Sequence, residues 1–353
     1  MLPVVHRTLP GPAPARVLEL FAGAGGAALG LHDAGFEHVA CVERDASAAA
    51  TLRAAGFPAV EADVRDLDYA ALAGTIDVLW ASPPCQAWSS ANQHAGPKGD
   101  EDIARNGWPW TLGVVRTVRP RWAIFENVKN ARAYVERAVV PELRKLYAHV
   151  TVWVLNAADH GVPQSRTRLF VIAGPRAVTP PSMVPRRTMR DAIAVAWDRP
   201  SPCVMTNEWK GRPTDPSWWK KLNNASDALA IATGGARRKL TLGECATLQT
   251  FPEGYPFAGD TEARYRQVGN AVPPVLAAAV ARAVRAAEEG VEAVRESLPA
   301  VAALVERLLV AAVAVVRRHP PRGVSPDDID TFISRHAARL RELATATLLR
   351  RTP

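Results

Sequence analysis

Two kinds of sequence run alternate along the first half of the chain. Short apolar runs, such as ARVLELF at residues 15–21 and IDVLWA at 76–81, have the length and composition of buried strands. Ala-rich or amphipathic runs, such as residues 131–147, separate them and are typical of helices. Strands that are joined through helices pair in parallel and are covered on both faces. The alternation therefore predicts an α/β fold with a mostly parallel sheet between two helical layers.

The predicted elements continue to Gly174, where the pattern breaks down and prolines multiply. Such a change indicates a domain boundary. Periodicity returns at residues 239–251 and in an Ala-rich run at 275–289, and the chain beyond Gly290 is again helical in pattern. The expected strands are residues 15–21, 38–43, 59–63, 76–81, 121–127, 149–157 and 168–174, and the expected helices of the first half are 26–35, 45–56, 102–118 and 131–147.

A glycine-rich turn, LELFAGAGGAALG, joins the first strand to the first helix. Glycines at such a turn let a cofactor approach the backbone closely. Gly23, Gly25 and Ala28 fit the dinucleotide spacing G-x-G-x-x-[GA], and Glu43 lies where a ribose-binding acid is expected. The pattern alone does not separate NAD from other adenosine-containing cofactors, and a tight packing turn would also explain it. Asp63 ends the third strand and suits either an adenine amino group or the cap of a following helix.

The loop after the fourth strand, SPPCQ, places a thiol at the sheet edge where ligands bind in such folds. A lone cysteine such as Cys85 is more often a small buried apolar residue. However, ENV closes the next strand and puts Glu126 at the same edge. QSRTR leads into the last strand and brings Arg166 and Arg168 to this edge, since residues two apart on a strand share a face. A thiol, a carboxyl group, two guanidinium groups and a cofactor turn together indicate a reaction site.

Basic charge is concentrated in one segment of the chain. The formal net charge is +8, and residues 175–240 contain 12 Lys or Arg against 5 Asp or Glu, a difference of +7. The same segment contains Trp197, Trp209, Trp218 and Trp219. This combination favours a nucleic-acid contact surface over a solvated face with a few core tryptophans.

The cysteine pattern argues against metal and disulfide scaffolds. The 4 cysteines show no CxxC spacing and no histidine in metal register, so we expect a reducing compartment. Residues 1–17 lack the apolar core of a signal peptide, and the apolar run at 308–316 is too short to span a bilayer. We therefore expect a soluble, cytoplasmic protein with no membrane partner.

Six segments, in order along residues 16–285, resemble the motifs of the DNA (cytosine-5) methyltransferases. LFAGAGG is similar to the S-adenosylmethionine turn of that family, SPPCQ to its catalytic loop, FENV to its cytosine-binding carboxylate motif and HGVPQSRTRLF to its arginine motif. RKLTLGECATLQTFPEGY and RYRQVGNAVPPVLAAAVA resemble its last two motifs. Ser82, Lys239 and Gly243 depart from the commoner residues, and we expect none of them to touch a reacting group. The chain after Gly290 is unmatched.

The resemblance implies a Rossmann-like S-adenosylmethionine-dependent methyltransferase fold and a role for each of three groups of residues. Glu43 would bind the ribose hydroxyls of the cofactor, and Asp63 the adenine amino group. The implied catalytic residues are Cys85, Glu126, Arg166 and Arg168; the cofactor residues are Phe21, Gly23, Gly25, Glu43, Asp63, Pro83 and Asn270; and the substrate contacts are Gln86, Ser89, Asn127, Gln164, Arg238 and Gln249.

The implied reaction is methyl transfer to carbon 5 of a cytosine that is flipped out of duplex DNA. Cys85 would attack carbon 6 as a thiolate, which Arg166 and Arg168 are expected to favour. Glu126 would hydrogen-bond or protonate ring nitrogen 3, and Arg168 would bind the carbonyl oxygen. The loop at residues 82–100 would close over the DNA. The resemblance implies no metal.

Four regions follow from the resemblance. Residues 1–174 would form the catalytic domain, 175–258 a small target recognition domain, 259–289 the final motif that returns to the catalytic domain, and 290–353 a helical extension. The extension, with 10 basic and 7 acidic residues, suits packing or self-association. The expected partner is double-stranded DNA, with a cognate restriction endonuclease if the enzyme belongs to a restriction-modification system rather than to an orphan or phage type. The expected state is a monomer, with dimerisation through the C-terminal helices as the alternative.

Three rival functions use parts of the same pattern. An RNA cytosine-5 methyltransferase acting on transfer RNA shares the scaffold, but the basic insert and the lack of Cys-Phe-Thr after the first loop residues favour DNA. A catalytically inactive DNA-binding regulator is disfavoured by the intact Cys85, Glu126 and Arg168. A nicotinamide oxidoreductase fits the glycine turn but leaves Cys85, Glu126 and the basic segment unexplained.

Overall fold

The computed structural model describes residues 14–85, 88, 107–206, 208, 225–232 and 239–288, together with residues 328 and 331. The chain forms two compact units, residues 1–283 and 284–353. Most of the predicted C-terminal extension, and the predicted helix at 102–118 as far as residue 106, lie outside the described residues. Within the described residues, no helix is long and apolar enough to cross a membrane.

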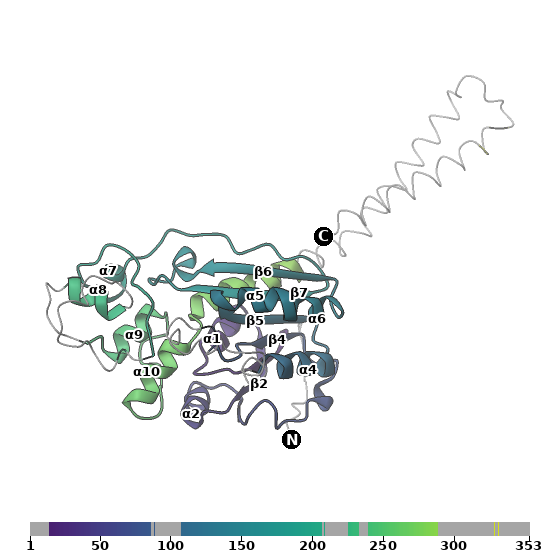
Figure 1. Ribbon diagram of the computed structural model, residues 1–353, viewed down its shortest axis with the longest axis horizontal. Coiled ribbons are helices and arrows are strands. Elements are labelled where there is room, and N and C mark those ends of the chain that lie inside the picture. The colour runs from purple at the N-terminus through teal and green to yellow at the C-terminus, as the bar shows by residue number, and fades with distance from the viewer. Residues whose placement is uncertain are drawn as a thin grey trace. The chain divides into compact units, whose positions relative to one another are not determined.

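A seven-stranded mixed sheet forms the centre of the first unit (Figure 1). The strand order is β3-β2-β1-β4-β5-β7-β6; the pairs from β3 to β5 are parallel, and β7 is antiparallel to both β5 and β6. The connection reverses direction between β1 and β4, and ligands bind at such a switch point. The predicted Rossmann-like fold is confirmed. The strands are β1 Arg16–Leu20, β2 Glu37–Glu43, β3 Ala59–Glu61, β4 Val78–Ala81, β5 Trp122–Val128, β6 His149–Asn156 and β7 Thr167–Gly174.

The helices connect the strands much as the periodicity predicts, with one irregular stretch. The predicted helix at 131–147 is divided, because a π-helical segment precedes Pro141, whose ring and missing N–H interrupt regular helical bonding. The helical elements are α1 Gly26–Asp33, α2 Ala46–Ala54, η1 Ala70–Leu72, α4 Trp108–Val118, η3 Lys129–Ala131, α5 Arg132–Tyr134, η4 Val135–Val139, α6 Val140–Arg144, η5 Ala157–His160, α7 Met189–Ile193, α8 Ala225–Ala232, α9 Leu242–Leu248 and α10 Thr261–Asn270, and residues 274–288 are also helical.

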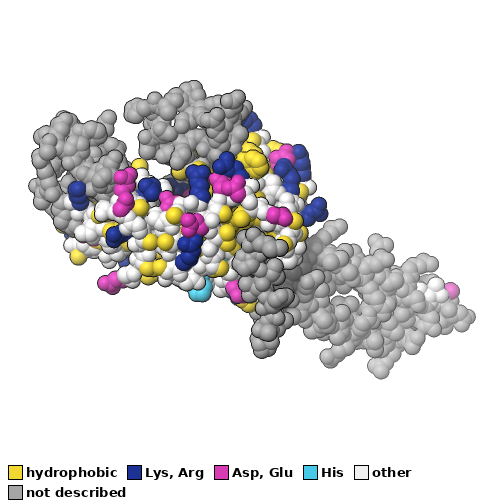
Figure 2. Space-filling view, turned by 90° about the horizontal axis from the view of Figure 1, so that it is seen from below, with side chains coloured by type: hydrophobic (Ala, Val, Ile, Leu, Met, Phe, Trp, Pro, Cys, Tyr) yellow, Lys and Arg dark blue, Asp and Glu magenta, His cyan; other side chains and the backbone are white. Residues whose placement is uncertain are grey.

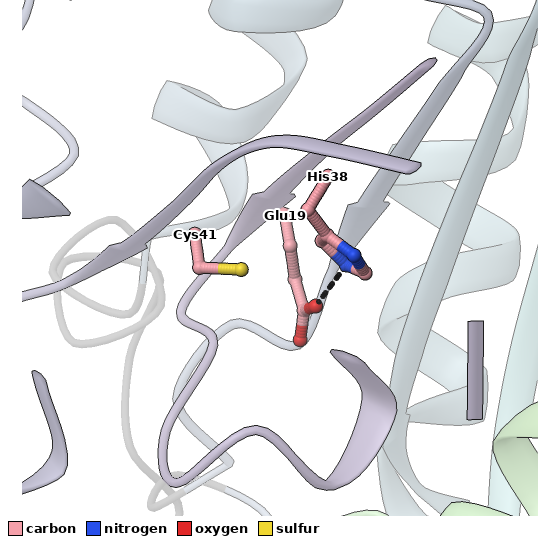
Figure 3. Close-up of side chains that lie close together, drawn as sticks. All are labelled: Glu19, His38 and Cys41. Carbon is pink, nitrogen blue, oxygen red and sulfur yellow. Dashed lines mark hydrogen bonds and ion pairs between the residues drawn. The ribbon is translucent and has the colours of Figure 1, made fainter. Parts of the chain in front are cut away.

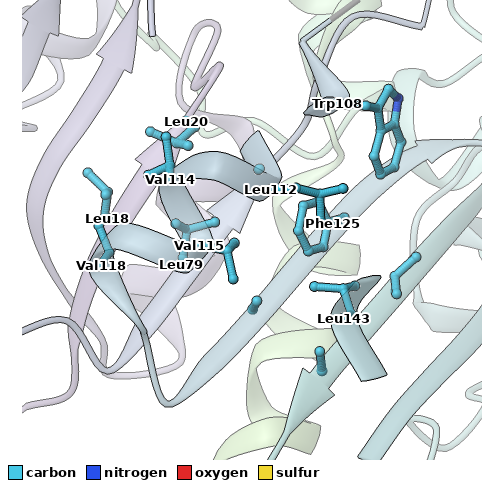
Figure 4. Packing of buried hydrophobic residues seen from close by; sticks show 14 of the residues in the cluster. Leu18, Leu20, Leu79, Trp108, Leu112, Val114, Val115, Val118, Phe125 and Leu143 are labelled. Atoms are coloured by element: carbon cyan, nitrogen blue, oxygen red, sulfur yellow. The ribbon is translucent and has the colours of Figure 1, made fainter. Parts of the chain in front are cut away.

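The main core lies between the sheet and α4 with α6 (Figure 4). Trp108, at the start of α4, stacks on Phe125 of β5 with ring centroids 5.7 Å apart. The opposite face is covered by α1 and α2, where Ala28, Cys41 and Leu52 form a separate buried cluster. A parallel sheet needs a helical layer on each face because its apolar side chains point to both faces.

A second core joins α7, α8, α9 and α10. Its buried members include Met189, Trp197, Leu229, Cys245 and Phe251. Helix α9 contacts α7 and α10, and α10 also contacts α2 of the sheet layer. In Figure 1, α7, α8 and α9 gather beside one end of the sheet, and α10 leads back toward it. The second core falls within the predicted small domain and final motif, whose boundaries remain predictions.

Helix α1 packs closely on the start of the final helical segment, and its glycines permit the contact. A β-carbon placed on Gly26 would lie 2.3 Å from the Val272 carbonyl oxygen. One placed on Gly30 would lie 2.4 Å from the Pro274 carbonyl oxygen and 2.6 Å from the Ala277 side chain. These distances are shorter than any side chain tolerates. The final predicted motif is therefore held directly against the helix that follows the cofactor turn.

Replacing Gly30 with Ala is expected to destabilise the protein by about 1–3 kcal/mol, because overpacking forces the two segments apart. The matched control is Gly113→Ala in α4, where an added β-carbon meets nothing within 4 Å. That change should stabilise the protein by about 0.5–1 kcal/mol, since alanine favours a helix interior. Urea unfolding of both variants measures the difference, and equal effects would contradict the proposed packing.

Candidate active site

The loop that carries Cys85 is fastened to the neighbouring strand β5. The Asn127 side-chain amide donates to the Pro83 carbonyl oxygen over 2.9 Å, and the Asn127 oxygen accepts from the Val128 N–H, also at 2.9 Å. Asn127 is 2% exposed. The contact of Asn127 with the substrate stays a prediction. In the ligand-free protein this buried amide bonds to the backbone. It positions the thiol loop.

Glu126 and Arg168 form an ion pair at the same edge of the sheet. Arg168 Nε lies 3.1 Å from Glu126 Oε1. The strand register places Arg168 opposite Val128, so the pair is diagonal on one face of β5 and β7. Burial raises the pKa of Glu126, and the charges of Arg168 and Arg166 oppose that rise. A carboxyl group whose pKa is raised can hold a proton and donate it, as a general acid must.

Ser82 contacts the same carboxyl group. Its side chain hydrogen-bonds to Glu126, and its hydroxyl oxygen accepts from Trp80 Nε1 over 3.1 Å. The expectation that this departure from the commoner glycine touches no reacting group is wrong, because a glycine has no hydroxyl to offer. Ser82 helps to orient Glu126 and lowers the pKa of its carboxyl group.

Cys85 is a free, half-buried thiol beside this pair. Burial raises the pKa of Cys85, and the Glu126 carboxylate raises it further. Arg168 and Arg166 act in the opposite direction, as predicted, but burial and Glu126 outweigh them. The expectation that the site favours the thiolate is therefore wrong for the ligand-free protein.

Arg166 points away from Arg168 and into the second core. Its Nη1 donates to Cys203 Sγ at 3.1 Å and to the Val204 carbonyl oxygen at 3.2 Å, and its Nη2 donates to the Gly269 carbonyl oxygen at 2.7 Å. The residue is 2% exposed. Strand β7 begins one residue later, so strand alternation does not apply to Arg166. In the ligand-free protein Arg166 is held by these bonds and acts on the Cys85 thiol through its charge, and its predicted catalytic role stays a prediction.

Gln164 and Gln249 form a buried amide pair. Gln164 Nε2 donates to Gln249 Oε1 at 3.0 Å, and Gln249 Nε2 donates to the Val268 carbonyl oxygen at 2.6 Å. The Val204 N–H donates to Gln164 Oε1 at 2.9 Å. Both side chains are 0% exposed. Buried amides must be satisfied inside the protein, and these are. The contact of the two residues with DNA stays a prediction.

Gly23 and Gly25 of the cofactor turn share a left-handed backbone conformation but have different surroundings. Gly23 has φ 55° and Gly25 has φ 85°, in the left-handed region that favours glycine. A β-carbon on Gly23 would meet nothing within 4 Å, so open space borders the turn there. The Gly23 N–H donates to Glu43 Oε2 at 2.8 Å, which brings the predicted ribose-binding acid to the turn. Phe21 also has a positive φ of 57°, and it packs against Gly107 at the start of α4.

The other predicted cofactor residues are at the sheet edge or beside it. Asp63 accepts from the Arg65 side chain at 2.8 and 2.9 Å, and these bonds lower the pKa of Asp63 to about 2. Only a turn follows it, so the alternative of a helix cap is wrong. Asn270 ends α10 and is exposed. The predicted substrate residues Gln86, Ser89 and Arg238, with Trp209, Trp218 and Trp219, lie outside the described residues.

A buried trio lies between β1 and β2 (Figure 3). Glu19 Oε2 and His38 Nε2 are 2.9 Å apart, and one ligand atom from each of Glu19, His38 and Cys41 lies within 4.8 Å of the others. The register shifts between Val17 and Leu18, which turns His38 and Cys41 to one face although they are three residues apart. The sequence spacing indicated no histidine in metal register with a cysteine, but in the folded protein His38 and Cys41 lie close enough to share a ligand. The bond between Glu19 and His38 satisfies both buried groups.

The described surface carries mixed charge. Figure 2 shows basic and acidic side chains interspersed on the face in view. Many are paired, such as Arg116 with Glu142 at 2.7 Å and Arg186 with Asp159 at 2.7 Å. Much of the basic segment predicted to contact nucleic acid lies outside the described residues, so its role stays a prediction.

Replacing Gln249 with Met is expected to cost about 1–3 kcal/mol of unfolding free energy, because it leaves buried polar groups unpaired. Thr247→Val, an exposed change on the same helix, should stay within about 0.5 kcal/mol of the parent. Chemical denaturation measures both. A stable Gln249→Met variant with weakened DNA affinity would support the predicted DNA contact and contradict the structural role.

Alkylation of Cys85 by iodoacetamide should be slow at neutral pH and accelerate as pH rises, because only the thiolate reacts and burial raises the thiol pKa. Glu126→Gln removes a charge that raises this pKa, so its rate profile should move to lower pH. The exposed carboxylate variant Glu142→Gln is the control and should not move it. Peptide-resolved mass spectrometry separates Cys85 from the other thiols. A Glu126→Gln profile that coincides with the control would refute the electrostatic coupling.

Comparison with known proteins agrees with this geometry. The family model for C-5 cytosine-specific DNA methylases matches residues 15–191 and 200–286. The Type II methyltransferase M.AplI of Arthrospira platensis is 33% identical over 307 residues, covering 76% of this chain and 85% of that protein. M1.HphI of Haemophilus parahaemolyticus is 30% identical over 324 residues, covering 76% and 86%.

Solved structures share the fold at low identity. A DNMT2 mutant from Spodoptera frugiperda has a TM-score of 0.57 at 16% identity, covering 75% of this chain and 98% of that one. The Dnmt2 methyltransferase of S. pombe has a TM-score of 0.55 at 17% identity, covering 77% and 99%. The matched family model spans both the sheet and the second core, and the chain belongs to the C-5 cytosine-specific DNA methylase family.

Proposed function

We propose that the protein is a DNA (cytosine-5) methyltransferase that transfers a methyl group from S-adenosylmethionine to carbon 5 of a flipped cytosine. The observation that carries the proposal is the Glu126–Arg168 ion pair at 3.1 Å beside the loop of Cys85, in a chain of this family. An acid, a guanidinium group and a thiol are the groups that this reaction needs around one pyrimidine.

The residues at the glycine turn fit the cofactor. Open space borders Gly23, and the Glu43 carboxylate lies next to it. Asp63 remains ionised because the bonds from Arg65 lower its pKa to about 2. In the bound state, S-adenosylmethionine supplies an electrophilic methyl group. Glu43 would then accept from the ribose hydroxyls and Asp63 from the adenine amino group, while Phe21, Gly25, Pro83 and Asn270 complete the binding site.

Each reacting group has a defined part in the transfer. The Cys85 thiolate would form a bond to carbon 6, and the ring electrons would move to carbon 5. Carbon 5 would take the methyl group as its bond to the sulfonium sulfur of S-adenosylmethionine breaks and S-adenosylhomocysteine leaves. Glu126 donates a hydrogen bond or its proton to ring nitrogen 3, which offsets the charge that develops there. Arg168 binds the carbonyl oxygen. Carbon 5 then loses its proton to solvent, any proton on ring nitrogen 3 returns to Glu126, and the sulfur–carbon bond breaks, which restores the aromatic ring and the thiolate.

The pKa values of the free protein suit this order of events. The Glu126 carboxylate raises the pKa of Cys85 while the site is empty of substrate. Once Glu126 shares a proton with the cytosine ring, its charge no longer opposes the thiolate, and Arg168 and Arg166 still favour it. The thiolate would then form mainly when the base is in place.

Double-stranded DNA with a short recognition sequence is the substrate that we favour. The relatives M.AplI and M1.HphI are named Type II methyltransferases, which supports a role in DNA modification and a cognate restriction endonuclease as partner. The basic segment at residues 175–240 suits phosphate contacts. Transfer to RNA is the alternative that the assay must separate.

The test is transfer of tritium from labelled S-adenosylmethionine to DNA and to RNA in parallel. Wild-type protein should label DNA, and Cys85→Ala should abolish labelling while cofactor binding persists, because the sulfur attacks the base and not the cofactor. Cys203→Ser retains most of the activity, because its hydroxyl can still accept from Arg166. Full turnover by Cys85→Ala would show that Cys85 is not the nucleophile. Labelling of RNA alone would show that the substrate is RNA and not DNA. Bisulfite sequencing of labelled DNA identifies the target sequence.

A further inference from the structure

Tyr255, which packs on the second core, hydrogen-bonds to the cofactor turn. The Tyr255 hydroxyl donates to the Ala24 carbonyl oxygen at 2.6 Å across 231 residues of sequence. Ala24 lies between the two left-handed glycines of the turn. A β-carbon on Gly25 would stand 2.9 Å from this hydroxyl, whereas one on Gly23 would meet nothing within 4 Å. Tyr255 therefore contacts the turn at Gly25, and the space for a ligand borders Gly23.

The tyrosine ring is itself held firmly. It belongs to an aromatic trio with Phe251 and Phe257, whose ring centroids are 4.9 to 5.0 Å apart. The trio occupies the segment between α9 and α10. The end of this segment is bonded to α2, because the Ala258 N–H donates to Thr51 Oγ1 at 2.9 Å. The hydroxyl is thus fixed in position before any ligand arrives.

The hydroxyl also keeps its proton. Burial raises the pKa of Tyr255, and the neighbouring Glu19 and Cys41 act in the same direction. It is therefore protonated at neutral pH and can donate the bond to the Ala24 carbonyl oxygen.

We propose that Tyr255 is a positioning residue for cofactor binding, which fixes the Ala24 carbonyl and so the conformation of the turn at residues 22–25. A turn with two glycines has many accessible conformations, and ordering it would otherwise be a cost of binding. Tyr255 would thereby raise cofactor affinity without touching the cofactor. This proposal rests on the proposed use of S-adenosylmethionine.

Tyr255→Phe removes the bond and keeps the ring contacts, so the variant should fold. Isothermal titration of the full-length protein with S-adenosylmethionine and with S-adenosylhomocysteine should show binding weakened about three- to tenfold, the usual effect of one hydrogen bond. The rate at saturating cofactor should be unchanged, so the loss should be confined to KM. This separation of KM from kcat is not expected of a general loss of packing.

The matched control is Tyr265→Phe, which removes a similar bond in the same core. The Tyr265 hydroxyl donates to the Leu240 carbonyl oxygen at 2.7 Å and does not contact the turn. Its affinity for the cofactor should equal that of the parent. Equal affinity in all three proteins, or an equal loss in both variants, would overturn the role of Tyr255. Wild-type protein that is folded but binds neither ligand would instead overturn the proposed function, and this inference with it.

Discussion

The buried ion pair between Glu126 and Arg168 is the constraint on which the arrangement of the site depends. Removing a carboxylate from water costs several kcal/mol, and Glu126 is 7% exposed. A guanidinium group at 3.1 Å offsets part of that cost. Arg168 is near the start of β7, and β7 is antiparallel to β5. The first residues of β7 therefore lie beside the last residues of β5. If β7 were parallel to β5, Arg168 would lie at the opposite edge of the sheet, away from Glu126.

Buried polar bonds, more than apolar contacts alone, determine how the second core meets the sheet. The Gln164–Gln249 pair, the bond from Arg166 to the Gly269 carbonyl and the bond from Tyr255 to the Ala24 carbonyl all cross this junction. Apolar surfaces tolerate sliding, whereas a displaced buried amide loses its partners at a cost of about 1–3 kcal/mol. The junction therefore has one favoured geometry, and α9 and α10 are held in fixed register with the site.

The sequence predicted the parts of the fold and site that depend on local pattern. Strand and helix runs, the glycine turn, and Cys85, Glu126 and Arg168 all carry a signal in residue type and spacing. The sequence did not show how polar residues beside the site, such as Asn127, Gln164 and Gln249, are bonded inside the protein. An amide that binds a ligand and one that binds a buried backbone group are the same in sequence, and tertiary packing decides between them. Arg166 precedes the first residue of β7, so the alternation of side chains along a strand does not fix the direction of its side chain.

The trio of Glu19, His38 and Cys41 was missed for a related reason. Residues three apart on a regular strand point to opposite faces, and only the register shift beside Val17 brings them together. A bulge of this kind leaves no clear mark in the sequence. Spacing rules for metal ligands or strand faces therefore fail wherever a strand is irregular.

Placing the thiol next to a carboxylate is at first sight a poor design for a nucleophile. Glu126 raises the pKa of Cys85, and burial raises it more. In the proposed reaction, however, the same carboxyl group must reach ring nitrogen 3, so it has to lie close to the sulfur that attacks carbon 6. The proximity then links the two titrations: a proton shared between Glu126 and the base reduces the charge that opposes the thiolate. A thiol that stays protonated without substrate is also less open to oxidation and alkylation. The raised pKa follows from the geometry that the chemistry requires.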